Sequence, residues 1–169
     1  MRAGESEAIA LQWGVNYRLY KPEDFAALYA IEQVCFQPPF RFSRAYIRQL
    51  VSSADAATWI AEEEGRMAGF AIVEWEPDVD GTIAYIQTLE VAPEQRGGGV
   101  GAKLLGRIEG SAREAGADRI WLHADAENFG AIRLYERHGY RLNGREEDYY
   151  ARGRAALVYL KSLETGLGS

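Results

Sequence analysis

Hydrophobic and polar residues alternate or recur at helical spacing along most of the chain, and this pattern predicts its elements. Alternation predicts a strand over 15–20. Apolar residues at helical spacing follow over 25–35, after Pro22 and two carboxylates that favour a helix start. Ser43 is placed to cap a second helix, whose apolar side lies within 46–51.

The rest of the chain continues this alternation of strands and helices. The turn-forming Glu63-Glu64-Gly65-Arg66 lies between two strand-like runs and predicts a hairpin. The expected elements are strands over 58–62, 67–75 and 81–91, a helix over 100–115 with Gly116 as its C-cap, a strand over 119–123, a helix from Asn128 to about 138, and strands over 140–142 and 156–160. Hairpins beside helical crossovers indicate an α/β (α+β) fold with a mixed sheet and helices on its faces.

The composition indicates the number of domains and excludes some classes of partner and site. The chain has 169 residues, 47% hydrophobic and 26% charged, which suits one globular core. We expect a flexible leader over 1–14, a single domain over 15–163 and a disordered tail over 164–169. No apolar run approaches the roughly 20 residues that span a bilayer, so no membrane association is expected. Cys35 is the single cysteine, which excludes an intramolecular disulfide, argues against a zinc or other metal site and favours the cytoplasm.

The charge distribution argues against a nucleic-acid partner. The chain carries 19 basic and 25 acidic residues, a net charge of −6, whereas broad phosphate neutralisation needs a basic face. Residues 1–80 contain 7 basic and 13 acidic residues, and residues 81–169 contain 12 of each, so the excess lies in the first half. An anionic ligand is therefore expected on the second half.

The segment 91–102 carries the clearest chemical signal. A strand ends, Gly97, Gly98 and Gly99 follow, and an amphipathic helix begins at once. Glycines let several backbone N–H groups converge, and the helix start adds partial positive charge, so the segment predicts a diphosphate site to which Arg96 can add charge. A P-loop is excluded because Lys103 is followed by Leu104 instead of Ser or Thr. A Rossmann match is weak, because three strands and a hairpin precede the loop.

This loop resembles the acyl-CoA signature of the GNAT superfamily of N-acyltransferases, met by Arg96, Gly99 and Gly101, and element order agrees with that superfamily over about 17–161. The resemblance implies a mixed, mostly antiparallel sheet of about six to seven strands flanked by about four helices. It also implies acetyl-CoA as donor and no metal. The implied acetyl-CoA contacts are Leu89, Glu90 and Val91 for pantetheine, Arg96, Gly97, Gly98, Gly99, Val100, Gly101 and Ala102 for the pyrophosphate, and Asn128, Ala131 and Tyr135 on the other side.

Within the superfamily the chain resembles the protein N-terminal acetyltransferases of the bacterial RimI type and the eukaryotic NatE type. Four local matches carry this resemblance: the loop over 32–40, the strand over 84–89, Trp121-Leu122-His123, and Asp148-Tyr149-Tyr150 with Arg152. The matches imply substrate contacts from Phe36, Pro38, Phe40, Gln87, Tyr149 and Tyr150. Gln87 stands where the NatE type has an apolar residue, and Phe40 where the RimI type usually has Trp, which leaves the first-residue preference open.

Acetyl transfer to an amine needs an uncharged nucleophile, a hydrogen-bond donor for the carbonyl oxygen as it becomes anionic, and an acid for the departing thiolate. An α-amine (pKa roughly 7.7–8.0) loses its proton far more readily than a lysine (roughly 10.4), a gap of about 3.4 kcal/mol, so a mild base suffices. His123 is the candidate base with Tyr85 beside it, and Tyr135 is the candidate acid. Each of these residues also has a purely structural interpretation. His123 would be a half-buried histidine at a strand end, Tyr85 an aromatic residue on the face of the sheet, and Tyr135 a core residue packed with Ile132.

Three functions follow from these residues. The leading hypothesis is a cytoplasmic acetyltransferase acting on a peptide or protein N-terminus, such as that of a ribosomal protein, by direct attack in a ternary complex. The first alternative is a small-molecule amine acetyltransferase. The second is a CoA-binding sensor or interaction domain without the chemistry.

Overall fold

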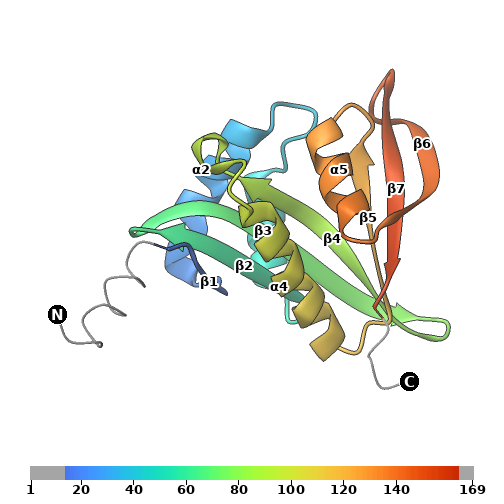
Figure 1. Ribbon diagram of the computed structural model, residues 1–169, viewed down its shortest axis with the longest axis horizontal. Coiled ribbons are helices and arrows are strands. Elements are labelled where there is room, and N and C mark those ends of the chain that lie inside the picture. Colours follow the sequence, from blue (N-terminus) through green and yellow to red (C-terminus); the bar gives the residue numbers. More distant parts are fainter. Residues whose placement is uncertain (1–13, 164–169) are drawn as a thin grey trace.

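The computed structural model describes residues 14–163, which form one seven-stranded sheet with helices on both faces (Figure 1). The expected leader over 1–14, apart from Gly14, and the tail over 164–169 lie outside the described residues. The strands are β1 (Asn16–Leu19), β2 (Ala56–Glu63), β3 (Arg66–Asp78), β4 (Gly81–Val91), β5 (Arg119–Asp125), β6 (Arg141–Ala151) and β7 (Arg154–Ser162). The helices are α2 (Phe25–Cys35), α3 (Arg44–Val51), α4 (Val100–Glu114) and α5 (Phe129–Arg137), with short 3-10 turns η1 (Pro22–Asp24) and η2 (Pro93–Gln95).

The sheet order is β1-β2-β3-β4-β5-β7-β6, and every neighbouring pair is antiparallel except β4 with β5. The predicted fold class is therefore confirmed. Leu104, Leu105 and Ile108 of α4 pack into one core, which also takes in Tyr135 of α5. A second core on the opposite face contains Leu28 of α2 with residues of α3 and β3. No helix in the described range 14–163 is both long and apolar enough to cross a membrane.

The sheet opens between β4 and β5. These two strands pair only where Ile83–Tyr85 face Arg119–Trp121, and they diverge beyond that point (Figure 1). On the β3 side, β4 stays paired as far as Val91. A register shift places Ile86 opposite Val73 but Thr88 opposite Ile72, so Gln87 is a β-bulge residue. In the described part of the chain, the edge of β4 beyond Tyr85 therefore has no partner strand.

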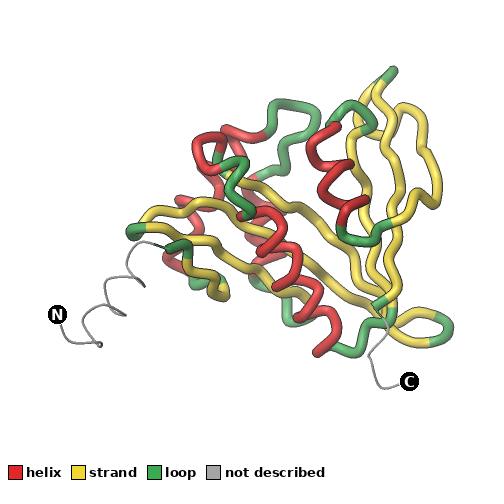
Figure 2. The backbone as a smooth tube through the Cα atoms, viewed as in Figure 1, coloured by secondary structure: helices red, strands yellow, loops and turns green. Residues whose placement is uncertain are grey.

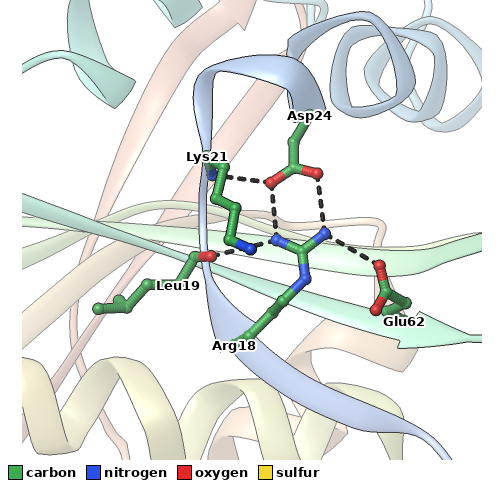
Figure 3. A network of polar contacts seen from close by, with 5 residues as sticks. All are labelled: Arg18, Leu19, Lys21, Asp24 and Glu62. Carbon is green, nitrogen blue, oxygen red and sulfur yellow. Dashed lines mark hydrogen bonds and ion pairs between the residues drawn. The ribbon is translucent and has the colours of Figure 1, made fainter. Parts of the chain in front are cut away.

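Arg18 of β1 fixes the start of the first helical segment to the sheet (Figure 3). Its guanidinium donates to both carboxylate oxygens of Asp24 at 2.8 Å and to Glu62 of β2 at 2.9 Å. The backbone N–H of Lys21 also donates to Asp24 at 2.7 Å, as in a capping box. This network anchors η1, and with it α2, on the β1–β2 edge.

Local signals in the sequence predict most element boundaries. The hydroxyl of Ser43 accepts from the N–H of Tyr46, and the side chain of Asn128 accepts from the N–H of Ala131, so both predicted N-caps are confirmed. The predicted C-cap of α4 is one residue off, because Ala115 is the C-cap and Gly116 follows it with a φ of 88°. Several strands extend beyond the predicted bounds, and the largest difference is in β6: the segment predicted over 140–142 is only its start, and the strand continues to Ala151. Most of β6 is exposed at the sheet edge and carries charged residues, so hydrophobic alternation does not reveal it.

Candidate active site

A cavity of about 570 Å³ occupies the opening between β4 and β5. At one end it is lined by the segment between α2 and α3, by β3 and by the β6–β7 hairpin. At the other end Leu89 of β4 and three residues of the α5 region, Asn128, Ala131 and Tyr135, form the wall. We call the part of this single cavity lined by the first group of residues the acceptor end, and the part lined by the second group the donor end.

Tyr85 and His123 meet where the two strands part. The Tyr85 hydroxyl lies 2.8 Å from Nδ1 of His123, and Nε2 of His123 lies 3.1 Å from a carboxylate oxygen of Glu146 on β6. Glu146 accepts only, so Nε2 carries the hydrogen and Nδ1 accepts from Tyr85. Burial, followed by the nearby Tyr149, raises the pKa of Tyr85, which keeps it a neutral donor. Glu146 was not among the residues predicted for the site, and only the fold shows its contact with His123.

Aromatic rings surround this pair at the acceptor end. The ring of Tyr149 stacks on His123 with centroids 4.2 Å apart, and Tyr150 lies 4.9 Å from Phe40. Phe40 belongs to the segment between α2 and α3, drawn as a loop in Figure 2. The Phe40–Tyr150 contact therefore bridges two segments distant in sequence, and it closes one side of the acceptor end.

The predicted substrate residues are mostly, but not all, brought to the cavity. Phe36, Phe40, Gln87, Tyr149 and Tyr150 line it. Pro38 does not, and its neighbour Pro39 lines the cavity in its place. The peptide between the two prolines is cis.

Tyr135 stands at the donor end. Its side chain is 6% exposed, its ring packs against Tyr140 at 5.4 Å, and it lines the cavity. No hydrogen bond joins its hydroxyl to another described residue, whereas the hydroxyl of Tyr140 donates to Glu109 at 3.0 Å. Burial raises the pKa of Tyr135, so its hydroxyl keeps its proton at neutral pH. Tyr135 packs in the core, as the structural alternative expects, and also reaches the cavity.

The glycine loop has the backbone conformation that an anion site needs. Gly97 and Gly99 have φ of 85° and 84°, in the left-handed region, and α4 begins directly after Gly99. In the described part of the chain, the amides of the three glycines donate to no backbone carbonyl. Arg96 folds back: its Nε donates to the carbonyl of Val91 at 3.1 Å. The loop thus offers backbone N–H groups and a helix N-terminus beside the donor end.

Two of the predicted acetyl-CoA residues have side chains engaged elsewhere. The Asn128 side chain caps α5. The Glu90 side chain is 3% exposed and faces α2, where it meets the fully buried Glu32, and the hydroxyl of Thr88 donates to it at 2.7 Å. Burial raises the pKa of both carboxyls, and the neighbouring Glu32 adds to the rise for Glu90. Among the described residues, Thr88 is the hydrogen-bond partner of one Glu90 oxygen, whereas the other Glu90 oxygen and both Glu32 oxygens have none, so both carboxyls favour the protonated form between α2 and β4.

No group of three or more His, Cys, Asp or Glu side chains suited to a metal ion occurs among residues 14–163.

Known proteins resemble this chain in sequence and in fold. Residues 25–140 match the model of the acetyltransferase (GNAT) family. Streptothricin acetyltransferase of Streptomyces lavendulae is 36% identical over 98 residues, which cover 57% of this chain and 51% of that protein. The N-terminal acetyltransferase A complex catalytic subunit NAA10 of Arabidopsis thaliana is 27% identical over 145 residues, covering 84% and 74%. The first of these matches thus spans about half of its relative's length.

A solved structure shows the same fold over nearly the whole chain. The ribosomal-protein-S18-alanine N-acetyltransferase from Escherichia coli superposes with a TM-score of 0.77 at 23% identity, covering 92% of this chain and 99% of that one. At this identity the likeness concerns the fold alone.

Proposed function

Because the chain belongs to the acetyltransferase (GNAT) family, we propose that it transfers acetyl from acetyl-CoA to the α-amino group of a peptide or protein N-terminus. The observation that carries the proposal is the Tyr85–His123 hydrogen bond, placed where the donor and acceptor ends of the cavity meet. The similarity to NAA10 supports the choice of acceptor.

Acetyl-CoA occupies the donor end in this proposal. The glycine loop and the start of α4 bind its diphosphate through backbone N–H groups. The free edge of β4, from Gln87 to Val91, offers backbone donors and acceptors to the pantetheine arm, as an added strand would use them. The thioester then lies between Tyr85 and Tyr135, because both side chains line the same cavity.

Tyr85, His123 and Glu146 take up the amine proton. As the amine nitrogen attacks the thioester carbonyl carbon, the Tyr85 oxygen accepts the amine proton and passes its own proton to Nδ1 of His123. The imidazolium that forms faces the Glu146 carboxylate, which stabilises it. An α-amine needs only this mild base, since a useful fraction of it is already neutral.

Tyr135 completes the reaction. The C–S bond breaks, and the departing thiolate takes the phenol proton of Tyr135. Burial raises the pKa of Tyr135, which keeps the phenol protonated before the reaction but also makes it a weaker acid toward the thiolate. The tyrosinate then regains a proton as the His123 imidazolium loses one. The proposal includes no acetyl-enzyme on Cys35, because this residue ends α2 and does not line the cavity. The amine attacks the thioester directly.

The test is thiol release dependent on acetyl-CoA, measured over peptides with free and with blocked N-termini, including Ala-first and Met-first sequences. Free peptides should be acetylated at the α-amine, identified by mass spectrometry, and blocked peptides should not. Turnover confined to small amines or antibiotics would reject the peptide assignment.

A small-molecule amine is the second candidate acceptor, and one observation favours it. The chain is 36% identical to streptothricin acetyltransferase over 98 residues, a higher identity than to NAA10. Streptothricin belongs in the same assay beside the peptides. The donor end and the residues around His123 serve either acceptor equally.

A further inference from the structure

A directed chain of hydrogen bonds crosses the acceptor end beside the Tyr85–His123 pair. The hydroxyl of Tyr46 on α3 donates to the side-chain carbonyl of Gln87 at 2.9 Å. The amide nitrogen of Gln87 donates to a carboxylate oxygen of Glu74 on β3. All three side chains line the cavity. Because each donor is already directed, the chain presents the Glu74 carboxylate as its charged end.

Glu74 has no cationic partner within residues 14–163. Its side chain is half-buried, and its charge is close enough to contribute, after burial, to the raised pKa of Tyr46. A carboxylate withdrawn from water without a cation is costly unless something else compensates it. A positively charged group entering the cavity would supply that compensation.

The position of Glu74 separates it from the reacting amine. In the β3–β4 ladder Glu74 lies opposite Tyr85, while His123 lies beyond Tyr85 on β5. Neighbouring strands are about 4.8 Å apart, so Glu74 and His123 stand on opposite sides of Tyr85. An amine bound for proton transfer to Tyr85 therefore leaves Glu74 free for another group of the same acceptor.

We propose that Glu74, held by Gln87 and Tyr46, forms a subsite for a second cationic group of the acceptor, such as the guanidinium or ammonium of a peptide's first side chain. This inference rests on the proposed function, since it assigns a substrate class to the same cavity. It also gives a role to Gln87: an apolar residue there would leave Glu74 without its amide donor.

The experiment compares an Arg-first peptide with the same peptide beginning with citrulline, which is nearly isosteric and uncharged. The wild-type protein should use the Arg-first peptide with kcat/KM about tenfold higher, the size expected for one charge-assisted hydrogen bond. Glu74→Gln should remove this preference and leave kcat/KM for the citrulline peptide within about twofold. Glu76→Gln is the matched control: Glu76 lines the cavity from the same strand but does not contact Gln87, so the preference should persist.

Three results would overturn the subsite: equal use of both peptides by the wild-type protein, an equal loss for both peptides in Glu74→Gln, or loss of the preference in Glu76→Gln. The equal loss would mean that Glu74 acts on the reacting amine or on folding, and the proposed function would stand. Circular dichroism of both variants identifies a folding defect.

Failure of the proposed function is distinguishable from failure of the subsite. If no peptide is acetylated, the peptide assignment is wrong, and the subsite is judged with agmatine against N-carbamoylputrescine, in which a neutral urea replaces the guanidinium. Preference for agmatine that is lost in Glu74→Gln would support the subsite. Equal turnover, or none with either amine, would reject it.

Discussion

The ring of His123 is held from two sides, by Tyr85 at Nδ1 and by Glu146 at Nε2, and the second contact is open to a direct test. Glu146→Ala removes the acceptor that fixes the tautomer and stabilises the imidazolium. We expect kcat to fall about tenfold, a part of the 10²-fold or larger effect of a general base, with KM for acetyl-CoA unchanged. Steady-state rates at saturating acetyl-CoA measure this.

The control for Glu146 lies on the same strand. Glu147→Ala breaks an exposed pair with Arg145 and should leave kcat unchanged. Because Glu146 acts through His123, the double variant Glu146→Ala with His123→Ala should be no slower than His123→Ala alone. Additive losses would show that Glu146 acts independently of the ring.

Tyr135 and Tyr140 form a matched pair of buried phenols with different partners. Tyr135→Phe removes a hydroxyl that makes no hydrogen bond to another described residue, so the melting temperature should change little while kcat falls at least tenfold. Tyr140→Phe leaves Glu109 without the phenol donor and should cost about 1–3 kcal/mol of stability with kcat retained. Thermal unfolding and thiol release on both variants make the comparison, and retained kcat in Tyr135→Phe would remove the acid role.

At the scale of elements, the carboxyl pair between α2 and β4 should make stability depend on pH. Burial raises the pKa of Glu32 and Glu90 above the unfolded value of roughly 4.3, so the folded protein holds more protons above that pH. This contribution is complete below the unfolded pKa and is lost as pH rises through the folded-state pKa. Stability against urea should therefore decline from about pH 5 to about pH 8, by at most about 1.36 kcal/mol per pH unit for each proton.

Glu90→Gln tests this origin. The amide cannot ionise, yet it can donate to Glu32 and still accept from Thr88. The urea midpoint of the variant should change less with pH than that of the wild-type protein, whereas the exposed Glu94→Gln should follow the wild-type curve. Parallel curves for all three proteins would place the pH dependence elsewhere.

Elements governed by local signals could be predicted, whereas most contacts between residues distant in the sequence could not. Ser43 and Asn128 predict where their helices begin, because an N-cap side chain needs only the backbone N–H three residues further along the chain. The bulge at Gln87 leaves no mark in the alternation of β4, although it decides which side chains face the cavity. The Tyr85–His123 contact was expected from the family resemblance together with the strand positions.

At the scale of the whole molecule, the sequence correctly predicted one mixed sheet. Hairpins and helical crossovers in this order are compatible with only a few arrangements of sheets and helices. It did not show that Glu146 contacts His123, since β6 is an exposed edge strand whose register shifts twice along β7. The sequence likewise did not show that Glu32 and Glu90, which are far apart in the chain, are buried next to each other. From the sequence alone, these carboxylates could not be assigned a partner, because their neighbours come from distant parts of the chain.

The net charge of −6 gives a last prediction on this scale. An acidic protein attracts a basic acceptor over a distance that salt shortens, from a Debye length of about 10 Å at 0.1 M to about 3 Å at 1 M. For a peptide with several basic residues beyond its second position, the KM for the peptide should rise about threefold or more when NaCl is raised from about 0.05 M to about 0.5 M, because the Debye length shortens over this range. A neutral peptide with the same first two residues should show little change, because its contacts in the cavity are the same. Equal salt dependence of the two KM values would mean that the acidic surface has no part in acceptor binding and that selectivity resides in the cavity alone.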